Sequence, residues 1–333
     1  MTKIAVIIPY YQKASGILRR ALESISLQRL SPEQEVEIIV VDDGSPVPAA
    51  QEVEAVEFKA QFSLTLIKQA NAGVAEARNR GLRQVDAATN YIAFLDSDDW
   101  WQEEHLSQGV RALEKGHDFY FCDNRRQGHH ESHFASGEAA LMSGYIKSHK
   151  NDGGIVSLTK NEIASVVLRE FPTQLSTVVY RKEKGEGLRF DPSFKNAGED
   201  MLFILQLVHQ SDAACFSPEA RVECGEGVNI YFGNIGWDTP GHLTRLSDRL
   251  RSHVHIRDVI ALSKENAAWN NKQIAKLRRD FVFHTLRQWV AHKGAWPQAA
   301  RALARQDASF LLWFPVHTVQ VSIGRLLKTY HPA

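Results

Sequence analysis

Apolar residues in the first hundred positions form short unbroken runs, and helix-like stretches separate these runs. The strand-like runs are 3–11, 36–45, 64–69 and 91–96, and helical spacing recurs after residue 16 and over 49–61 and 74–85. Strands that are apolar on both faces and alternate with helices predict a parallel sheet covered by helices on both sides. The first third of the chain therefore has the pattern of an α/β domain.

Beyond residue 100 the pattern changes more often. It predicts a helix over 102–117, a strand over 119–124, an irregular excursion over 125–155, a strand over 173–182, a helix over 198–211, and short strands with glycine-rich turns over 212–240. From residue 243 the spacing is helical throughout, with one apolar stripe formed by Ile274, Leu277, Phe281, Thr285 and Trp289. We therefore expect a domain over 1–240 and a helical, basic region over 241–333.

The net charge of zero hides a strong asymmetry. Residues 241–333 carry 15 Lys and Arg against 5 Asp and Glu, whereas residues 1–240 have an excess of acidic groups. Such a basic segment indicates contact with an anionic partner, such as a membrane surface or an acidic glycan, and the alternative is a solvated helical face packed on the acidic body. An oligomer formed through these helices is also open. Nothing in the pattern indicates a nucleic-acid partner.

The segment 308–324 carries no formal charge, but it is too short and too polar to span a bilayer. One interpretation places it on a membrane, with Trp313 and Phe314 at the interface and Arg325 and Lys328 beyond. The other interpretation is a core helix.

The N-terminal run and the cysteines bear on the compartment. The N-terminal apolar run is shorter than a signal-peptide core. The three widely spaced cysteines (Cys122, Cys215 and Cys224) are expected to be reduced thiols. We expect a cytoplasmic protein, with peripheral contact at the inner face of the membrane as a further option.

Polar residues follow three of the predicted strands directly. The strand ends read PYY at 9–11, DDGS at 42–45 and DSDD at 96–99. Carboxyl ends of parallel strands meet at one edge of the sheet, where α/β proteins bind ligands. Asp96, Asp98 and Asp99 repel one another, and a hard divalent cation, itself often bound to a diphosphate, is a suitable counter-charge.

Five motifs in order, VIIPYY, VVDDGS, NAGVAEARNRGL, DSDD and GED, resemble family 2 glycosyltransferases with the GT-A fold. The resemblance covers roughly residues 4–210. It implies a Rossmann-like, mostly parallel central sheet, a nucleotide-sugar donor with UDP as the expected nucleotide, and a Mn²⁺ or Mg²⁺ cofactor. It also implies one inverting displacement onto a saccharide or lipid-linked saccharide acceptor, in surface polysaccharide biosynthesis.

The resemblance assigns the metal to the DSDD motif. It makes Asp98 the direct ligand and places Asp96 near the ribose or a metal-bound water, while Asp99 can take either part. A metal held by only one or two carboxylates is reasonable because phosphates supply further ligands. The alternative is that Asp98 or Asp99 caps a helix beginning near Trp100.

The nucleotide base is assigned to the first two strand ends and the helix after the third strand. By resemblance, Asp43 accepts the N3–H of uracil, Pro9 and Tyr11 wall the base pocket, and Arg78 contacts base or phosphate. The alternatives are a tight turn for the Asp-Gly pair, with Asp42 as its structural member, and an exposed helix arginine for Arg78.

The GED motif supplies the candidate base. Asp200 matches the residue that deprotonates the acceptor hydroxyl in the family, and Glu199 beside it is an acceptor-binding or orienting group. Acidic residues at the start of an apolar helical run are also what a helix N-terminus prefers.

The segment 225–242 departs from the family's pattern, and the histidines of 125–133 allow a second interpretation. No residue over 225–242 matches the family's diphosphate clamp well, and His242 is a weak candidate. Histidines over 125–133 suggest zinc, but their spacing fits an acceptor-side loop better. The signature of processive synthases is absent, which favours single addition.

Two other classes remain open on the sequence alone. One is a nucleotidyltransferase of related fold, although the glycine-rich basic loop that would hold a triphosphate is missing. The other is a non-catalytic relative that binds glycan or membrane.

Overall fold

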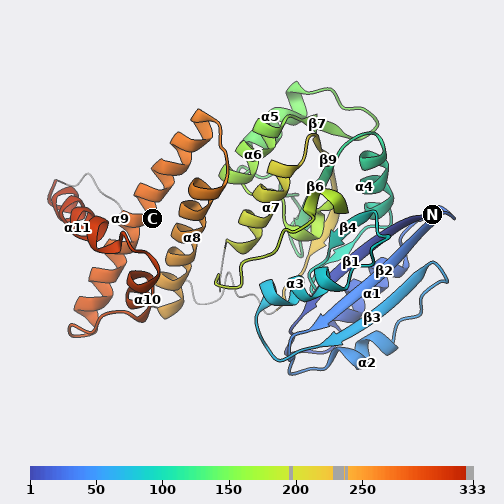
Figure 1. The fold of residues 1–333 in the computed structure, drawn as a ribbon, viewed down its shortest axis with the longest axis horizontal. Helices are drawn as coiled ribbons and strands as arrows, with labels where there is room; N and C mark the ends of the chain where they lie inside the picture. The colour runs from blue at the N-terminus through green and yellow to red at the C-terminus, as the bar shows by residue number, and fades with distance from the viewer. Residues whose placement is uncertain (195–197, 228–235, 237–238, 328–333) are drawn as a thin grey trace. The chain divides into compact units, whose positions relative to one another are not determined.

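The computed structural model describes residues 1–194, 198–227, 236 and 239–327 (Figure 1). The chain divides into two compact units. The first is Met1–Ser193 with Glu199–Val228, and the second is Phe194–Gly198 with Asn229–Ala333. A functional division of the chain at residue 240 stays a prediction.

A parallel block of four strands begins the first unit. These strands are β1 (Thr2–Tyr10), β2 (Gln34–Asp42), β3 (Phe62–Lys68) and β4 (Tyr91–Phe94), in the order β3-β2-β1-β4. All three neighbouring pairs are parallel, as the unbroken apolar runs predict. Consequently the carboxyl ends of β1, β2 and β4 lie at the same edge.

Short antiparallel strands extend this block into a mixed sheet. β8 (Val179–Arg181) pairs antiparallel with both β4 and β6 (Phe119–Arg126), and β6 pairs parallel with β9 (Ala214–Cys224). β5 (Trp100–Trp101) and β7 (Val156–Leu158) each pair antiparallel with β9. The α/β class with a largely parallel centre is confirmed.

The helices of the first unit cover both faces of the sheet. They are α1 (Ile17–Ser26), α2 (Ala49–Glu54), α3 (Val74–Gln84), α4 (His105–Glu114), α5 (Ala140–Ser148), α6 (Lys160–Arg169) and α7 (Glu199–Gln210). Four predictions need correction. α2 ends at Glu54, and the excursion over 125–155 contains α5. The strand expected over 173–182 is reduced to β8, which follows a 3₁₀ turn at Leu175–Thr177, and the short strands expected over 212–240 are, in the described residues, one strand of 11 residues, β9. Pattern alone missed these because packing decides where short elements end.

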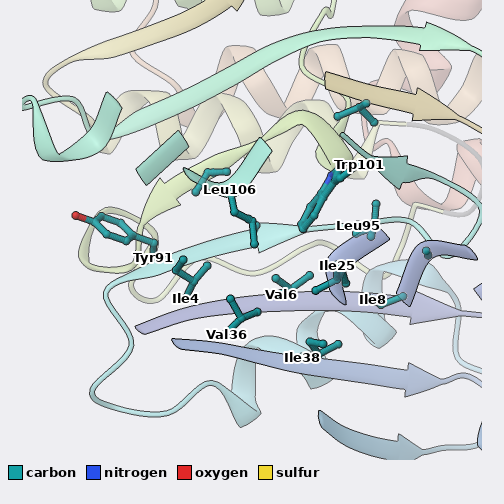
Figure 2. Close-up of a cluster of buried hydrophobic side chains, with 14 of the residues drawn as sticks. Ile4, Val6, Ile8, Ile25, Val36, Ile38, Tyr91, Leu95, Trp101 and Leu106 are labelled. Carbon is teal, nitrogen blue, oxygen red and sulfur yellow. The ribbon is translucent and has the colours of Figure 1, made fainter. Parts of the chain in front are cut away.

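Alternate residues of β1 point to opposite helical layers. Figure 2 shows Ile4, Val6 and Ile8 on the same side as Ile25 of α1, in one buried cluster. On the opposite face Ile7 meets α3 at Gly81, where an added Cβ would lie 2.4 Å from the Ile7 Cγ2. Burial of both faces explains why the strand is apolar at every position.

The second unit contains four helices, drawn orange to red in Figure 1: α8 (Pro240–Val259), α9 (Lys264–Ala291), α10 (Gln298–Gln306) and α11 (Phe310–Leu326). The predicted stripe on α9 is buried except for Trp289, which is 39% exposed. Gln288 is buried instead, because successive four-residue steps rotate around a helix of 3.6 residues per turn.

Trp313 and Phe314 are buried in the core of the second unit, so the interpretation that places them at a membrane interface is wrong. The core-helix interpretation is correct for that face of α11. Within the described ranges, no helix is long and apolar enough to cross a membrane. All three cysteines are buried and none forms a disulfide.

Candidate functional site

Gln12 connects the ends of three strands. Its backbone N–H donates to the Ser45 Oγ at 2.8 Å, after β2, and its Nε2 donates to the Ser97 Oγ at 3.1 Å, after β4. Gln12 itself follows β1 and is only 3% exposed. The three polar strand ends therefore form one connected region. The sequence patterns did not single out Gln12, although a polar residue directly after PYY was its signal.

The two aspartates at the end of β2, Asp42 and Asp43, accept hydrogen bonds from the chain itself. Asp42 accepts from the backbone N–H groups of Ser45 and Ala49, at 2.9 and 3.0 Å. It therefore anchors the turn and the start of α2.

Asp43 holds the loop that leads into α3. Its carboxylate accepts from the Gln69 Nε2, the Ala72 N–H and the Gly73 N–H, each at 2.8 Å, and the residue is 3% exposed. Pro9 is buried in β1 opposite Val41. These contacts explain the local structure, and the base-binding parts of Asp43, Pro9 and the half-buried Tyr11 stay predictions.

The aspartates after β4 are held differently. Asp99 accepts from the Ser176 hydroxyl at 2.6 Å and from the Gly225 N–H at 3.0 Å, while Asp98 accepts from the Gly227 N–H at 2.9 Å. Residues 100 and 101 form β5 and α4 begins at His105, so the alternative that Asp98 or Asp99 caps a helix near Trp100 is wrong.

Burial and mutual repulsion shift the acidities of this cluster. The pKa of Asp98 is raised to about 6 because the carboxyl is buried and lies near Asp96. Burial, with Asp96 and Asp98 nearby, raises the pKa of Asp99 well above its ordinary value. A bound cation would reverse both shifts, so the carboxylates fit a divalent metal chemically. Among the described residues, no three His, Cys, Asp or Glu side chains converge to hold one alone.

Arg78 joins the β4 end to the start of α7. Its Nη2 lies 2.8 Å from the Asp96 Oδ1 and its Nη1 lies 3.3 Å from the Glu199 Oε1, and its side chain is 6% exposed. The interpretation of Arg78 as an exposed helix arginine is therefore wrong, whereas its neighbours Arg80 and Arg83 on α3 are exposed. The carboxylates outweigh the burial penalty and raise the pKa of Arg78.

Glu199 and Asp200 form the first turn of α7, so the helix-start interpretation is also correct. Burial and the neighbouring Asp200 raise the pKa of Glu199 to about 7, although Arg78 opposes the shift. Burial likewise raises the pKa of Asp200, whose Oδ1 accepts from the Met201 N–H at 2.7 Å. A carboxylate with a raised pKa is a better proton acceptor, which suits a general base.

Two glycines of the segment after β9 approach Asp98 closely. A Cβ on Gly225 would lie 1.9 Å from the Asp98 carbonyl oxygen, and one on Gly227 would lie 2.5 Å from its Oδ2. Only glycine fits at such distances. The sequence signal was the repeated glycine in CGEG, although a glycine-rich turn was all that it predicted.

The structure gives less support to the remaining candidate site residues. His242 packs on His284 inside the second unit, with ring centroids 4.4 Å apart. Residues 228–235 and 237–238, within the stretch where the family's diphosphate clamp is expected, lie outside the described residues. His129 and His130 are exposed on the 125–133 segment, and across the part of the chain that the structure describes no cluster of metal-ligating side chains supports a zinc site there.

Comparison with known proteins decides the family. Residues 5–162 match the model of glycosyl transferase family 2. The chain is also 31% identical over 306 residues to the succinoglycan biosynthesis protein ExoW of Rhizobium meliloti, and the match covers 87% of this chain and 94% of that protein. The chain belongs to glycosyl transferase family 2. It is therefore a glycosyltransferase, as the five motifs indicate.

Solved structures agree on the GT-A fold of this family 2 enzyme. TarS 1–349 of S. aureus in complex with UDP-GlcNAc has a TM-score of 0.57 at 18% identity, covering 85% of this chain and 72% of that chain. The mannosyltransferase PcManGT from Pyrobaculum calidifontis, in complex with GDP-Man and Mn²⁺, has a TM-score of 0.55 at 16% identity, covering 98% and 88%. The chain spans 43% of the longer TarS structure.

Proposed function

We propose that this glycosyltransferase moves a single sugar from a nucleotide sugar, most simply a UDP-sugar, to a saccharide or lipid-linked saccharide acceptor with inversion. The observation that carries the proposal is the pairing of buried Arg78 with both Asp96 and Glu199, which couples a carboxylate cluster at the strand ends to the carboxylates of α7. A pathway of surface polysaccharide synthesis is supported by the likeness to ExoW.

The donor half of the site is assigned to the strand ends. Asp98 would hold Mn²⁺ or Mg²⁺, with Asp96 and Asp99 at the ribose or a metal-bound water. When bound, the ion supplies a Lewis acid that stabilises the leaving diphosphate. Asp43, Pro9 and Tyr11 would line the base pocket. Arg78 orients Asp96, and its charge favours an anionic donor.

The acceptor half is assigned to the start of α7. Asp200 takes the proton of the acceptor hydroxyl, whose oxygen forms a bond to the anomeric carbon. The bond from that carbon to the diphosphate oxygen breaks, and its electron pair leaves with the nucleotide diphosphate. Glu199, held by Arg78, orients Asp200 or the acceptor. One displacement inverts the anomeric configuration.

Because the chain belongs to a glycosyltransferase family, the alternative of a nucleotidyltransferase is no longer needed. The alternative of a non-catalytic relative predicts that no sugar is transferred, so a measurement of turnover tests it. Cytoplasmic location, peripheral membrane contact and an oligomer through the C-terminal helices belong to the proposal as well. Each of them is independent of the chemistry.

The donor assignment is tested by thermal unfolding with Mn²⁺ plus UDP. We expect the pair to raise the melting temperature of the wild-type chain, and Asp98→Ala to lose that rise. Glu54→Ala, an exposed carboxylate of α2, is the matched control and should keep it. No shift with any nucleotide diphosphate in the wild-type chain would refute the donor site.

The base assignment is tested by Asp200→Asn in a donor screen that detects released nucleotide diphosphate. We expect turnover to fall by at least about a hundredfold, the range of general-base catalysis, because the amide cannot take the proton. Stabilisation by Mn²⁺ plus UDP should stay nearly intact. Retained turnover would exclude Asp200 as the base.

A further inference from the structure

Ser176 contacts the loop after β4 through a single hydroxyl group. Its Oγ accepts a hydrogen bond from the Asp96 N–H at 3.0 Å and donates one to the Asp99 Oδ2 at 2.6 Å. Its carbonyl oxygen accepts from the indole Nε1 of Trp101 at 2.7 Å. The residue is completely buried, although serine is mostly an exposed residue. The hydroxyl therefore connects the backbone of Asp96 to the carboxylate of Asp99.

The pairing of β8 with β4 brings Ser176 to this place. Val179 of β8 lies opposite Ala93 of β4 in the antiparallel register. Continued past the end of β4, the same register brings Ser176 opposite Asp96. The serine belongs to the 3₁₀ turn Leu175–Thr177, which comes directly before β8. Its position is thus set by the sheet, and its short side chain has little freedom of its own.

Asp99 needs support because it lies among like charges. Asp96 and Asp98 are close enough to repel its carboxylate, and Asp99 is only 6% exposed to water. Both of its oxygens accept hydrogen bonds, Oδ2 from Ser176 and Oδ1 from the Gly225 N–H at 3.0 Å. Without such donors, repulsion would favour an arrangement in which the carboxylates are further apart. Oxygens that have moved apart would bind a divalent cation less well.

We propose that Ser176 is a positioning residue of the donor site: it keeps the Asp99 carboxylate beside Asp96 and Asp98, so that the loop after β4 is ready for a divalent cation and its diphosphate. The inference rests on the donor site proposed above and adds a residue from outside the DSDD motif. Residues that orient the groups around a metal contribute about ten- to a hundredfold to its affinity. If the hydroxyl only satisfied buried polar groups, its removal would lower stability and leave the affinity for the cation unchanged.

The test is a titration of the full chain with Mn²⁺ in the presence of UDP. The electron paramagnetic resonance signal of the free ion measures how much Mn²⁺ is bound. We expect Ser176→Ala to weaken Mn²⁺ binding by about tenfold. Ser176→Cys keeps a weaker donor at the same position and should weaken binding by roughly threefold. Circular dichroism verifies that each variant is folded.

Thr177→Val is the matched control. The Thr177 side chain belongs to the same 3₁₀ turn and is equally buried, but its hydroxyl donates to the Gln174 carbonyl at 2.6 Å. We expect urea unfolding to show a loss of stability in Ser176→Ala and in Thr177→Val, whereas Mn²⁺ binding should weaken only in Ser176→Ala. Equal weakening in both variants would contradict a positioning role for Ser176.

A double-mutant cycle decides whether the serine acts through Asp99. In the Asp99→Ala background, Ser176→Ala should weaken Mn²⁺ binding by no more than about twofold, because the carboxylate that the hydroxyl supports is gone. A full tenfold loss in that background would overturn the proposal, since the serine would then act on another part of the chain.

Turnover with a sugar donor separates binding from chemistry. In Ser176→Ala the Mn²⁺ concentration that gives the half-maximal rate should rise by about tenfold, while the rate at saturating Mn²⁺ should stay within about twofold of wild type. A lower rate that excess Mn²⁺ does not restore would contradict a role in positioning the site for the cation.

The donor site and the role of Ser176 fail in different ways. If the wild-type chain binds no Mn²⁺ in the presence of UDP, the donor site is refuted, and the role of Ser176 is refuted with it. If the wild-type chain binds Mn²⁺ and Ser176→Ala binds it equally well, the donor site is retained and only the role of Ser176 is refuted.

Discussion

The ends of β2 and β4 carry similar acidic sequences, but the surroundings of their carboxylates differ. At the end of β2, Asp42 and Asp43 accept five hydrogen bonds from their own chain, four of them from backbone N–H groups. After β4, Asp98 and Asp99 are buried close to Asp96, and their pKa values rise. Similar acidic sequences can therefore form a structural anchor or a cluster of carboxylates whose mutual repulsion is compensated only in part.

The difference distinguishes carboxylates that stabilise the fold from carboxylates that favour the binding of a cation. Hydrogen bonds donated to a carboxylate stabilise its charge. Repulsion between neighbouring carboxylates destabilises their charged forms, and a bound cation relieves that repulsion. The β2 end holds the loops around the site, and the β4 end is arranged to gain a ligand. Replacing a carboxylate of the first kind should lower the stability of the ligand-free protein strongly, even where it also lines the proposed base pocket. Replacing one of the second kind should affect ligand binding more than stability.

The largest expected effect is on folding. Asp43→Ala removes an acceptor of three hydrogen bonds and leaves buried donors, so the free energy of unfolding should fall by about 3 kcal/mol. Asp98→Ala in the ligand-free protein should cost much less, since it also relieves repulsion. Urea unfolding of both variants measures the contrast, and equal losses would remove the distinction between the two strand ends.

The second effect depends on pH through Glu199. The folded pKa of about 7 exceeds the ordinary 4.5, so the folded state binds more protons between these values and stability falls as pH rises through that window. Glu199→Gln mimics the protonated form and should gain about 2 kcal/mol relative to wild type at pH 8, but little at pH 4. Glu54→Gln on the exposed part of α2 should show no such trend. Urea unfolding at both pH values provides the check.

The smallest effect is on ligand binding at the β4 end. Gly227→Ala forces the Asp98 carboxylate to move, because the new methyl would lie 2.5 Å from its Oδ2. The affinity for Mn²⁺ plus UDP should fall by about tenfold, as for other disturbed supports of a metal ligand. Gly137→Ala, which meets nothing within 4 Å, is the control. Calorimetric titration measures both, and similar affinities would show that the close approach of Gly227 is unimportant.

Periodicity predicted the central sheet because every residue of β1 from Ile4 onward is buried on one side or the other. Unbroken apolar runs of strand length, separated by helical stretches, are typical of a buried parallel sheet and of little else. The site residues Asp96, Asp98 and Asp200 were found for a similar reason, since polar groups at strand ends and helix starts stand out against apolar neighbours. Their roles in sugar transfer stay predictions.

Contacts between distant segments could not be predicted in this way. Arg78 and Glu199 are 121 residues apart, and Gly227 meets Asp98 across 129 residues, so no local pattern links them. The exposure of one face of α11 also escaped, because its two faces are equally apolar in sequence. The burial of Trp313 followed from which helix packs against it, which only the tertiary structure specifies.

The three-residue strand β8 has a consequence for how the protein is made. Among the described strands it is the one that joins β4 to β6 in the sheet, because both pair with it. The ribosome must therefore release the chain through Arg181 before the two halves of the sheet can become continuous. Until then, β4 presents an open edge on the nascent chain, and such edges invite wrong pairing. Synthesis slowed before that point would prolong the exposure.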